Sequence, residues 1–166
     1  MARPIRHDDD IALQSGLKRL SPEGKVYRFL QYRGAFTEKE LHYLTHCDMV
    51  DHYAMMLAVT DDAGHEIDRI GVARYIRDKE TPDLAEVAIV LVDEWQRRGG
   101  GTFLLTALAA EAWKRDIRRW HALTMADNTG IQRLLNLVGR KLGERRMGHG
   151  TVEQTYALFP PDAKAA

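Results

Sequence analysis

An unbroken apolar run, Val87 to Val92, is followed by the stretch Glu94-Trp95-Gln96-Arg97-Arg98-Gly99-Gly100-Gly101-Thr102. A run of this kind predicts a buried strand. Apolar residues then recur at helical spacing between Gly101 and Arg115, which predicts a helix laid against a sheet. A buried strand that leads through two arginines and three glycines into a helix predicts a phosphate site, because backbone N–H groups at a helix start bind anions.

The length and charge of the chain limit its class and its partners. Its 166 residues are the size of one domain, and we expect a single domain over residues 1–166. The 24 Lys and Arg residues balance the 24 Asp and Glu residues, so no overall charge favours nucleic acid or a membrane as partner. The single cysteine, Cys47, excludes an internal disulfide. Because no N-terminal apolar stretch resembles a signal peptide, we expect a cytoplasmic protein, either a monomer or a homodimer.

The remaining patterns predict an α/β (α+β) fold, in which a mixed, mostly antiparallel sheet carries helices on both faces. We expect helices over 8–20, from the Ser21-Pro22 cap to residue 29, after the Thr37–Glu40 capping box, over 101–115 and over 128–138. We expect strands over 53–60, 67–76, 84–92, 120–125 and 151–158, the first three of them as an antiparallel meander.

Two common phosphate motifs do not fit the glycine stretch. A Walker loop needs a lysine before Thr102, and a dinucleotide fingerprint needs a third spaced glycine and a βαβ opening. The spacing Gln96-x-x-Gly99-x-Gly101 instead resembles the acyl-CoA pyrophosphate loop of the GNAT (GCN5-related) N-acetyltransferases. The resemblance covers nearly the whole chain, because the order of helices, meander, loop, helix, strand and helix is also similar.

Within that superfamily the chain is most similar to the catalytic domain of bacterial Pat-type protein lysine acetyltransferases. The similar stretches are Leu20-Ser21-Pro22, Tyr27-Arg28-Phe29, Glu40-Leu41 with Leu44, Asp48, His52, Ala54 and Ala85-Glu86-Val87-Ala88. The resemblance implies acetyl-CoA as co-substrate, no metal, and direct acetyl transfer to an amine, with a protein lysine side chain as the preferred acceptor. Two alternatives remain open: a small-molecule amine as acceptor, and a non-catalytic acyl-CoA sensor.

The resemblance also implies a set of cofactor contacts. Backbone groups of Val90, Leu91 and Val92 would pair with the pantetheine arm, and an N–H of Leu91 or a neighbour would stabilise the oxyanion. The pyrophosphate would lie on the loop, where small glycines admit it and the arginines add charge-assisted hydrogen bonds. The loop residues assigned to this contact are Gln96, Arg97, Arg98, Gly99, Gly100, Gly101 and Thr102.

Glu86 is the one ionisable residue in the strand pattern from Leu84 to Val92. A carboxylate in so apolar a run is costly unless it is used or paired, and a desolvated glutamate is a stronger base than an exposed one. Acetyl transfer needs a deprotonated amine. The corresponding position in Pat-type enzymes holds the catalytic glutamate, so we assign Glu86 as general base. The alternative is a structural glutamate at the edge or a partner of Arg74 across the sheet.

Asn128 begins a predicted helix, where an N-cap asparagine is expected on structural grounds. In the resembled family an asparagine there also contacts the cofactor, and Gly139 matches the glycine that ends this helix. Many of these enzymes carry a tyrosine acid seven residues after the asparagine. This chain has Leu135 there, which excludes a tyrosine acid at this place; solvent is an adequate proton source for the leaving thiolate, and which group protonates it stays open.

A group of possible metal ligands, His42, His46, Cys47 and His52, lies before the meander. It lacks the glutamate of the metalloprotease pattern and a second pair of ligands, so we interpret it as surface histidines with a packed cysteine. For the acceptor site we expect one wall formed by Tyr27, Phe29, Tyr32 and Phe36. Asp48 and Asp51 are interpreted as helix-end and loop residues instead of a cage for a second amine.

Overall fold

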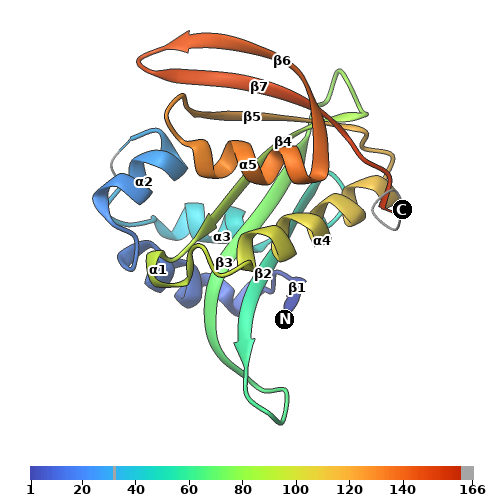
Figure 1. Cartoon of the computed structure of the whole chain (residues 1–166). Coiled ribbons are helices and arrows are strands. Elements are labelled where there is room, and N and C mark those ends of the chain that lie inside the picture. The colour runs from blue at the N-terminus through green and yellow to red at the C-terminus, as the bar shows by residue number, and fades with distance from the viewer. Residues whose placement is uncertain (32, 162–166) are drawn as a thin grey trace.

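The computed structural model describes residues 1–31 and 33–161. A seven-stranded sheet runs through it in the order β1-β2-β3-β4-β5-β7-β6 (Figure 1). Every described neighbouring pair is antiparallel except β4 and β5, which are parallel. This confirms the expected mixed sheet and its antiparallel meander. The strands are β1 (Ala2–Pro4), β2 (His52–Thr60), β3 (Glu66–Arg77), β4 (Leu84–Leu91), β5 (Arg119–Met125), β6 (Gly139–Gly148) and β7 (Thr151–Leu158).

Local capping explains where the helices begin. Ser21 accepts a hydrogen bond from the N–H of Gly24, and Thr37 and Glu40 form the predicted capping box. The predicted helix over 8–20 is shorter in the structure and is preceded by a 3-10 turn, His7–Asp9. The helices are α1 (Asp10–Lys18), α2 (Pro22–Phe29), α3 (Glu38–Thr45), α4 (Gly100–Lys114) and α5 (Thr129–Val138).

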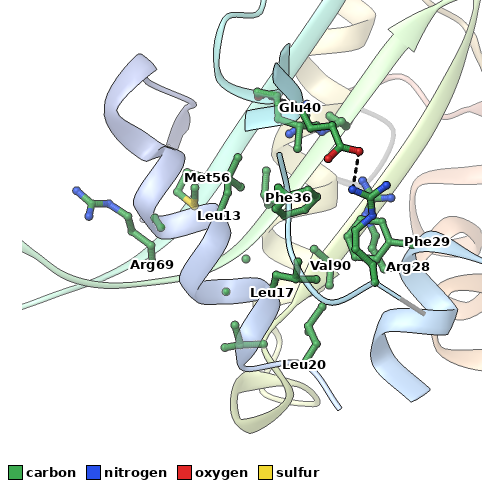
Figure 2. Close-up of a pocket in the computed structure, with 18 of the residues that line it drawn as sticks. Leu13, Leu17, Leu20, Arg28, Phe29, Phe36, Glu40, Met56, Arg69 and Val90 are labelled. Carbon is green, nitrogen blue, oxygen red and sulfur yellow. Dashed lines mark hydrogen bonds and ion pairs between the residues drawn. The ribbon is translucent and has the colours of Figure 1, made fainter. Parts of the chain in front are cut away.

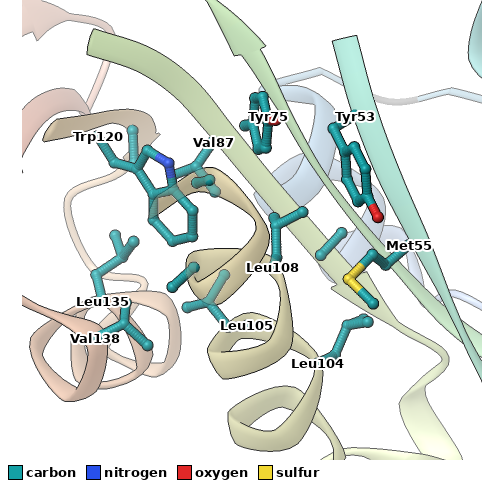
Figure 3. Close-up of a cluster of buried hydrophobic side chains, with 14 of the residues drawn as sticks. Tyr53, Met55, Tyr75, Val87, Leu104, Leu105, Leu108, Trp120, Leu135 and Val138 are labelled. Atoms are coloured by element: carbon teal, nitrogen blue, oxygen red, sulfur yellow. The ribbon is translucent and has the colours of Figure 1, made fainter. Parts of the chain in front are cut away.

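Helices cover both faces of the sheet, and each face has its own apolar cluster (Figure 1). On one face α4 and α5 bury the larger cluster, in which Trp120, Leu105 and Leu135 have no exposed surface (Figure 3). On the other face α1 packs Leu13 against Met56 and the strands around it. Burial of these side chains supplies the main driving force for folding.

Two strands were not expected from the sequence. β1 has three residues and ends in Pro4, so it offers almost no periodic signal. β6 is an edge strand whose residues after Gly139 are all exposed, and its charged sequence shows no apolar alternation. Pairing with β7 therefore decides that this segment is a strand. No helix among the described residues has the length and apolar content needed to span a membrane.

Candidate active site

The strands β4 and β5 separate partway along their length. They pair only where Leu84–Glu86 meets Arg119–His121, although β4 continues to Leu91 and β5 to Met125. Within residues 1–31 and 33–161, nothing pairs as a strand with β4 beyond Glu86 on its β5 side. Backbone groups at such an edge must find other partners, and an extended ligand can supply them. Val90 and Leu91, which the resemblance assigns to the pantetheine arm, lie in this section.

Hydrogen bonds join the loop after β4 to the end of that strand. The side-chain amide of Gln96 donates to the carbonyl oxygen of Leu91 at 3.0 Å and to the Asp93 carboxylate at 3.2 Å. The N–H of Val92 donates to the carbonyl of Ile70 at 2.9 Å. The structure thus gives Gln96 a role in shaping the loop, and the Val92 N–H pairs within the protein instead of facing the gap.

A different feature of the structure explains why glycine occupies each of the three positions of the loop. Gly99 has a φ of 84°, and a Cβ placed on it would meet nothing within 4 Å. A Cβ on Gly100 would lie 2.9 Å from a methyl carbon of Leu57, because α4 packs closely on the sheet. A Cβ on Gly101 would lie 3.1 Å from Leu134 of α5. Of the three glycines, each expected to leave room for phosphate, Gly99 alone faces open space.

Groups that bind anions nevertheless converge at the start of α4. Its first turn carries no acidic residue, so nothing offsets the positive end of the helix dipole. Arg97 and Arg98 are exposed, and in the described part of the chain neither forms an ion pair. The Arg98 guanidinium lies 5.3 Å from the centre of the Trp95 ring, and Thr102 is exposed nearby. Free helix N–H groups beside two unpaired guanidiniums suit a pyrophosphate.

Glu86 lies where β4 and β5 begin to separate, and its side chain is exposed. The expectation of a desolvated carboxylate is therefore wrong, because the side chain of Glu86 is open to solvent at the last β4 residue that pairs with β5. The suggested pairing with Arg74 is also absent among the described contacts, since Arg74 donates to the carbonyl of Leu44 and to His52. The positive charge of Arg28 attracts Glu86 electrostatically. An exposed carboxylate at the gap is accessible to an incoming amine.

A cavity of about 270 Å³ lies between the N-terminal helices and the sheet (Figure 2). Val90 lines it, so the cavity reaches the face of β4 that carries Glu86 two pleats away. Phe29 and Phe36 line it as expected for an acceptor wall, whereas Tyr27 lies beside Glu23 and Asp127 instead. Tyr32 lies outside the described residues.

Four arginines line this cavity, Arg28, Arg33, Arg69 and Arg74, and the sequence patterns did not identify it as a basic site. Arg74 is only 4% exposed, although it lies in the apolar run Val72 to Ile76. A charged residue inside an apolar strand was the signal that identified Glu86, and the same signal was available for Arg74. Arg28 and Arg33 come from α2 and the loop after it, where sequence offers no periodic signal for burial.

Asn128 caps α5 as predicted, because its side-chain oxygen accepts a hydrogen bond from the N–H of Ile131 at 3.3 Å. The helix ends at Val138, directly before Gly139. Leu135 is fully buried in the core between α4 and the sheet. A side chain at this position packs in the core, and contact between Asn128 and a cofactor remains a prediction.

The residues near α3 have structural partners. The rings of His42 and His46 stack with centroids 3.7 Å apart, and Cys47 donates to the carbonyl of Leu44. The Asp48 carboxylate accepts hydrogen bonds from the N–H groups of residues 50, 51 and 52. Asp51 pairs with Arg77 at 2.7 Å. These contacts agree with the interpretation of both aspartates as helix-end and loop residues.

Comparisons with known proteins agree with this geometry. A model of the acetyltransferase (GNAT) family matches residues 25–139. The acetyltransferase Pat of Mycolicibacterium smegmatis is 30% identical over 159 residues, which are 96% of this chain and 45% of that protein. The chain thus spans less than half the length of this relative.

Solved structures show the same likeness. The GNAT domain of S. lividans PAT superposes with a TM-score of 0.79 at 32% identity, covering 95% of this chain and 89% of that one. A putative acetyltransferase from Salmonella typhimurium, solved with acetyl-CoA, has a TM-score of 0.71 at 16% identity and covers 98% of both chains. At that identity the second structure shows a likeness of fold alone.

Proposed function

The chain belongs to the acetyltransferase (GNAT) family, and on that premise we propose that it transfers an acetyl group from acetyl-CoA to an amine. The observation that carries the proposal is the gap between β4 and β5, which ends at the glycine loop. The pyrophosphate lies at the start of α4 beside Arg97 and Arg98, and the pantetheine arm follows the unpaired edge of β4.

The reaction proceeds by direct transfer, with Glu86 as general base. Glu86 takes a proton from the amine, directly or through a water, and the amine nitrogen then attacks the thioester carbonyl carbon. A backbone N–H at Leu91 or a neighbour stabilises the resulting oxyanion. The carbon–sulfur bond breaks, the amide forms, and the thiolate of coenzyme A takes a proton from solvent.

We propose a protein lysine side chain as the acceptor. The exposure of Glu86 supports this choice, because an extended lysine can reach it while the backbone of the substrate protein stays outside. The likeness to Pat points the same way. A small amine is the second candidate, favoured by the cavity beside Val90, which has the size for a small molecule.

Acetyl-CoA binding tests the loop, and the chain offers a matched control for it. Gly99 and Gly64 have nearly equal positive φ values, 84° and 86°, and open space around the missing Cβ. Alanine at either position carries a similar backbone cost. Acetyl-CoA should raise the melting temperature of the wild type and of Gly64→Ala, and Gly99→Ala should reduce the shift. Absence of any shift in the wild type would remove the basis of the proposal.

Catalysis by Glu86 needs a separate assay, in which coenzyme A release is measured with a pool of amines and lysine-containing proteins. Glu86→Gln should bind acetyl-CoA as the wild type does but lower kcat by roughly a hundredfold or more, the scale of a lost general base. Glu80→Gln removes an exposed carboxylate elsewhere and is the control. Full activity in Glu86→Gln would exclude the base role, and an inactive wild type that binds acetyl-CoA would indicate a sensor.

A further inference from the structure

The cavity under the N-terminal helices holds guanidinium groups with unused hydrogen-bond donors. Arg74 donates from Nη1 to the carbonyl of Leu44 at 3.3 Å and to Nε2 of His52 at 2.9 Å, and its side chain is also in hydrogen-bonding contact with Cys47. Its Nε and Nη2 are buried and, among the described residues, have no partner. The Nε of Arg28 is likewise buried and has no hydrogen-bond partner among the described residues. Buried donors without acceptors are rare in proteins and each one is unfavourable, so these groups require an explanation.

The cavity also has more positive than negative charge. Arg33 pairs with Glu40 at 2.6 Å, and that carboxylate is further engaged by the N–H of Thr37. No described carboxylate hydrogen-bonds to Arg28 or Arg74, and Glu86 attracts Arg28 only from its exposed position at the gap.

Burial lowers the pKa of three basic groups, two that line the cavity and His52 behind Arg74. Burial and then Arg74 lower the pKa of Arg28 to about 10, and burial lowers the pKa of Arg74 as well. Burial and then Arg74 lower the pKa of His52 to about 4, so this ring is neutral and accepts from Arg74 at neutral pH. Burial is the first cause of each shift because each charged group has lost solvation, and Glu86, Cys47 and Asp48 oppose the shifts only in part.

We propose that this cavity binds a carboxylate carried by a small molecule, held by the free edge of Arg74 and by Arg28. The N–H groups on Nε and Nη2 of an arginine point the same way and match the two oxygens of a carboxylate. Because Arg74 leaves these two groups unpaired together, its geometry favours a planar bidentate anion.

The rest of the cavity suits a short aliphatic chain that joins this carboxylate to a reacting group. Leu13, Leu17 and Met56 line it, and Figure 2 shows Leu13 and Leu17 extending from α1, with Arg28 and Glu40 on the side of α2 and α3. Val90 lines the same space at the proposed place of the thioester. A polyamine without a carboxylate would instead be repelled by the unpaired guanidiniums.

The carboxylate can enter from either of two sources, and assigning the source rests on the proposed acyl transfer. It can end the acyl chain of the donor, as in a dicarboxylic acyl-CoA, which leaves a protein lysine as acceptor. It can also belong to the acceptor, as in a free amino acid. Both sources place the same group against Arg74 and Arg28.

Direct binding tests the site without any reaction. Glutarate is titrated into the protein by calorimetry, with 1,5-pentanediol as the uncharged control. Glutarate should bind and pentanediol should not, and Arg74→Gln and Arg28→Gln should each weaken glutarate binding roughly tenfold or more. Arg69→Gln is the control, because Arg69 also lines the cavity but is already paired with Glu66 and Asp9. Should Arg74→Gln not fold, Arg28→Gln carries the test.

Two kinetic arms then identify the source. Succinyl-CoA is compared with butyryl-CoA, and lysine with cadaverine, because each pair differs by one carboxylate. A preference for the carboxylate member in either arm that Arg74→Gln removes supports the proposal and names the source. Failure of glutarate to bind, together with no carboxylate preference in either arm, would overturn it. A wild-type melting shift with acetyl-CoA would meanwhile persist, so the proposed acetyl transfer would stand.

Discussion

His52 makes the stability of this fold depend on pH in a direction that can be measured. Its ring is 9% exposed, and its Nε2 accepts a hydrogen bond from the Arg74 guanidinium at 2.9 Å. Protonation would bury a second positive charge and remove the acceptor for Arg74. Burial, followed by the charge of Arg74, lowers the pKa of His52 from 6.5 to about 4, while Asp48 opposes this shift. The folded protein therefore binds fewer protons here than the unfolded chain does between these two pH values.

The sign and size of the effect follow from proton linkage. Stability rises with pH wherever the unfolded state binds more protons, so the His52 contribution is lost as pH falls from 6.5 towards 4. With those pKa values the loss is about 2 kcal/mol at pH 5 and about 3 kcal/mol below pH 4. A loss of 2 kcal/mol corresponds to roughly 4–8 °C in melting temperature for a domain of this size.

Urea unfolding of the wild type and of His52→Gln at pH 7, 6, 5 and 4.5 measures this contribution. Glutamine can still accept from Arg74 but does not titrate, so the other titrating groups cancel in the difference between the two proteins. That difference should move in favour of His52→Gln by about 2 kcal/mol between pH 7 and pH 5. A difference that stays constant over this range would refute the argument that His52 is held neutral by burial and by Arg74.

Two further predictions concern packing, and each has a control within the chain. Alanine at Gly139 would place a Cβ 2.7 Å from the backbone oxygen of Ala157. Gly139→Ala should therefore lower the free energy of unfolding by about 1–3 kcal/mol. Gly143→Ala on the same strand is the control, because its Cβ would meet nothing within 4 Å. Leu135→Ala should lower the free energy of unfolding by about 2–5 kcal/mol because Leu135 is fully buried. Leu137→Ala should change it little because Leu137 is 42% exposed. Equal melting temperatures within either pair of variants would contradict the packing described.

Much of the fold can be read from local signals. The capping box at Thr37, the cap at Ser21 and the N-cap at Asn128 were each predicted, because capping depends on residues a few positions apart. The glycine loop and the following helix were likewise recognised from short-range spacing. β1 and β6 escaped prediction because their strand character comes from pairing with distant partners.

In the candidate site, too, some features follow from local sequence and others only from the tertiary structure. The sequence alone pointed to Glu86 and to the loop before α4, since a carboxylate in an apolar run and a glycine cluster at a helix start are visible without a structure. Only the tertiary structure decided that Glu86 is exposed, because this depends on how the N-terminal helices cover that face of β4. It alone also placed Arg28 beside Arg74 in one cavity. Burial and charge balance are sums over segments that are distant in sequence, so no local pattern contains them.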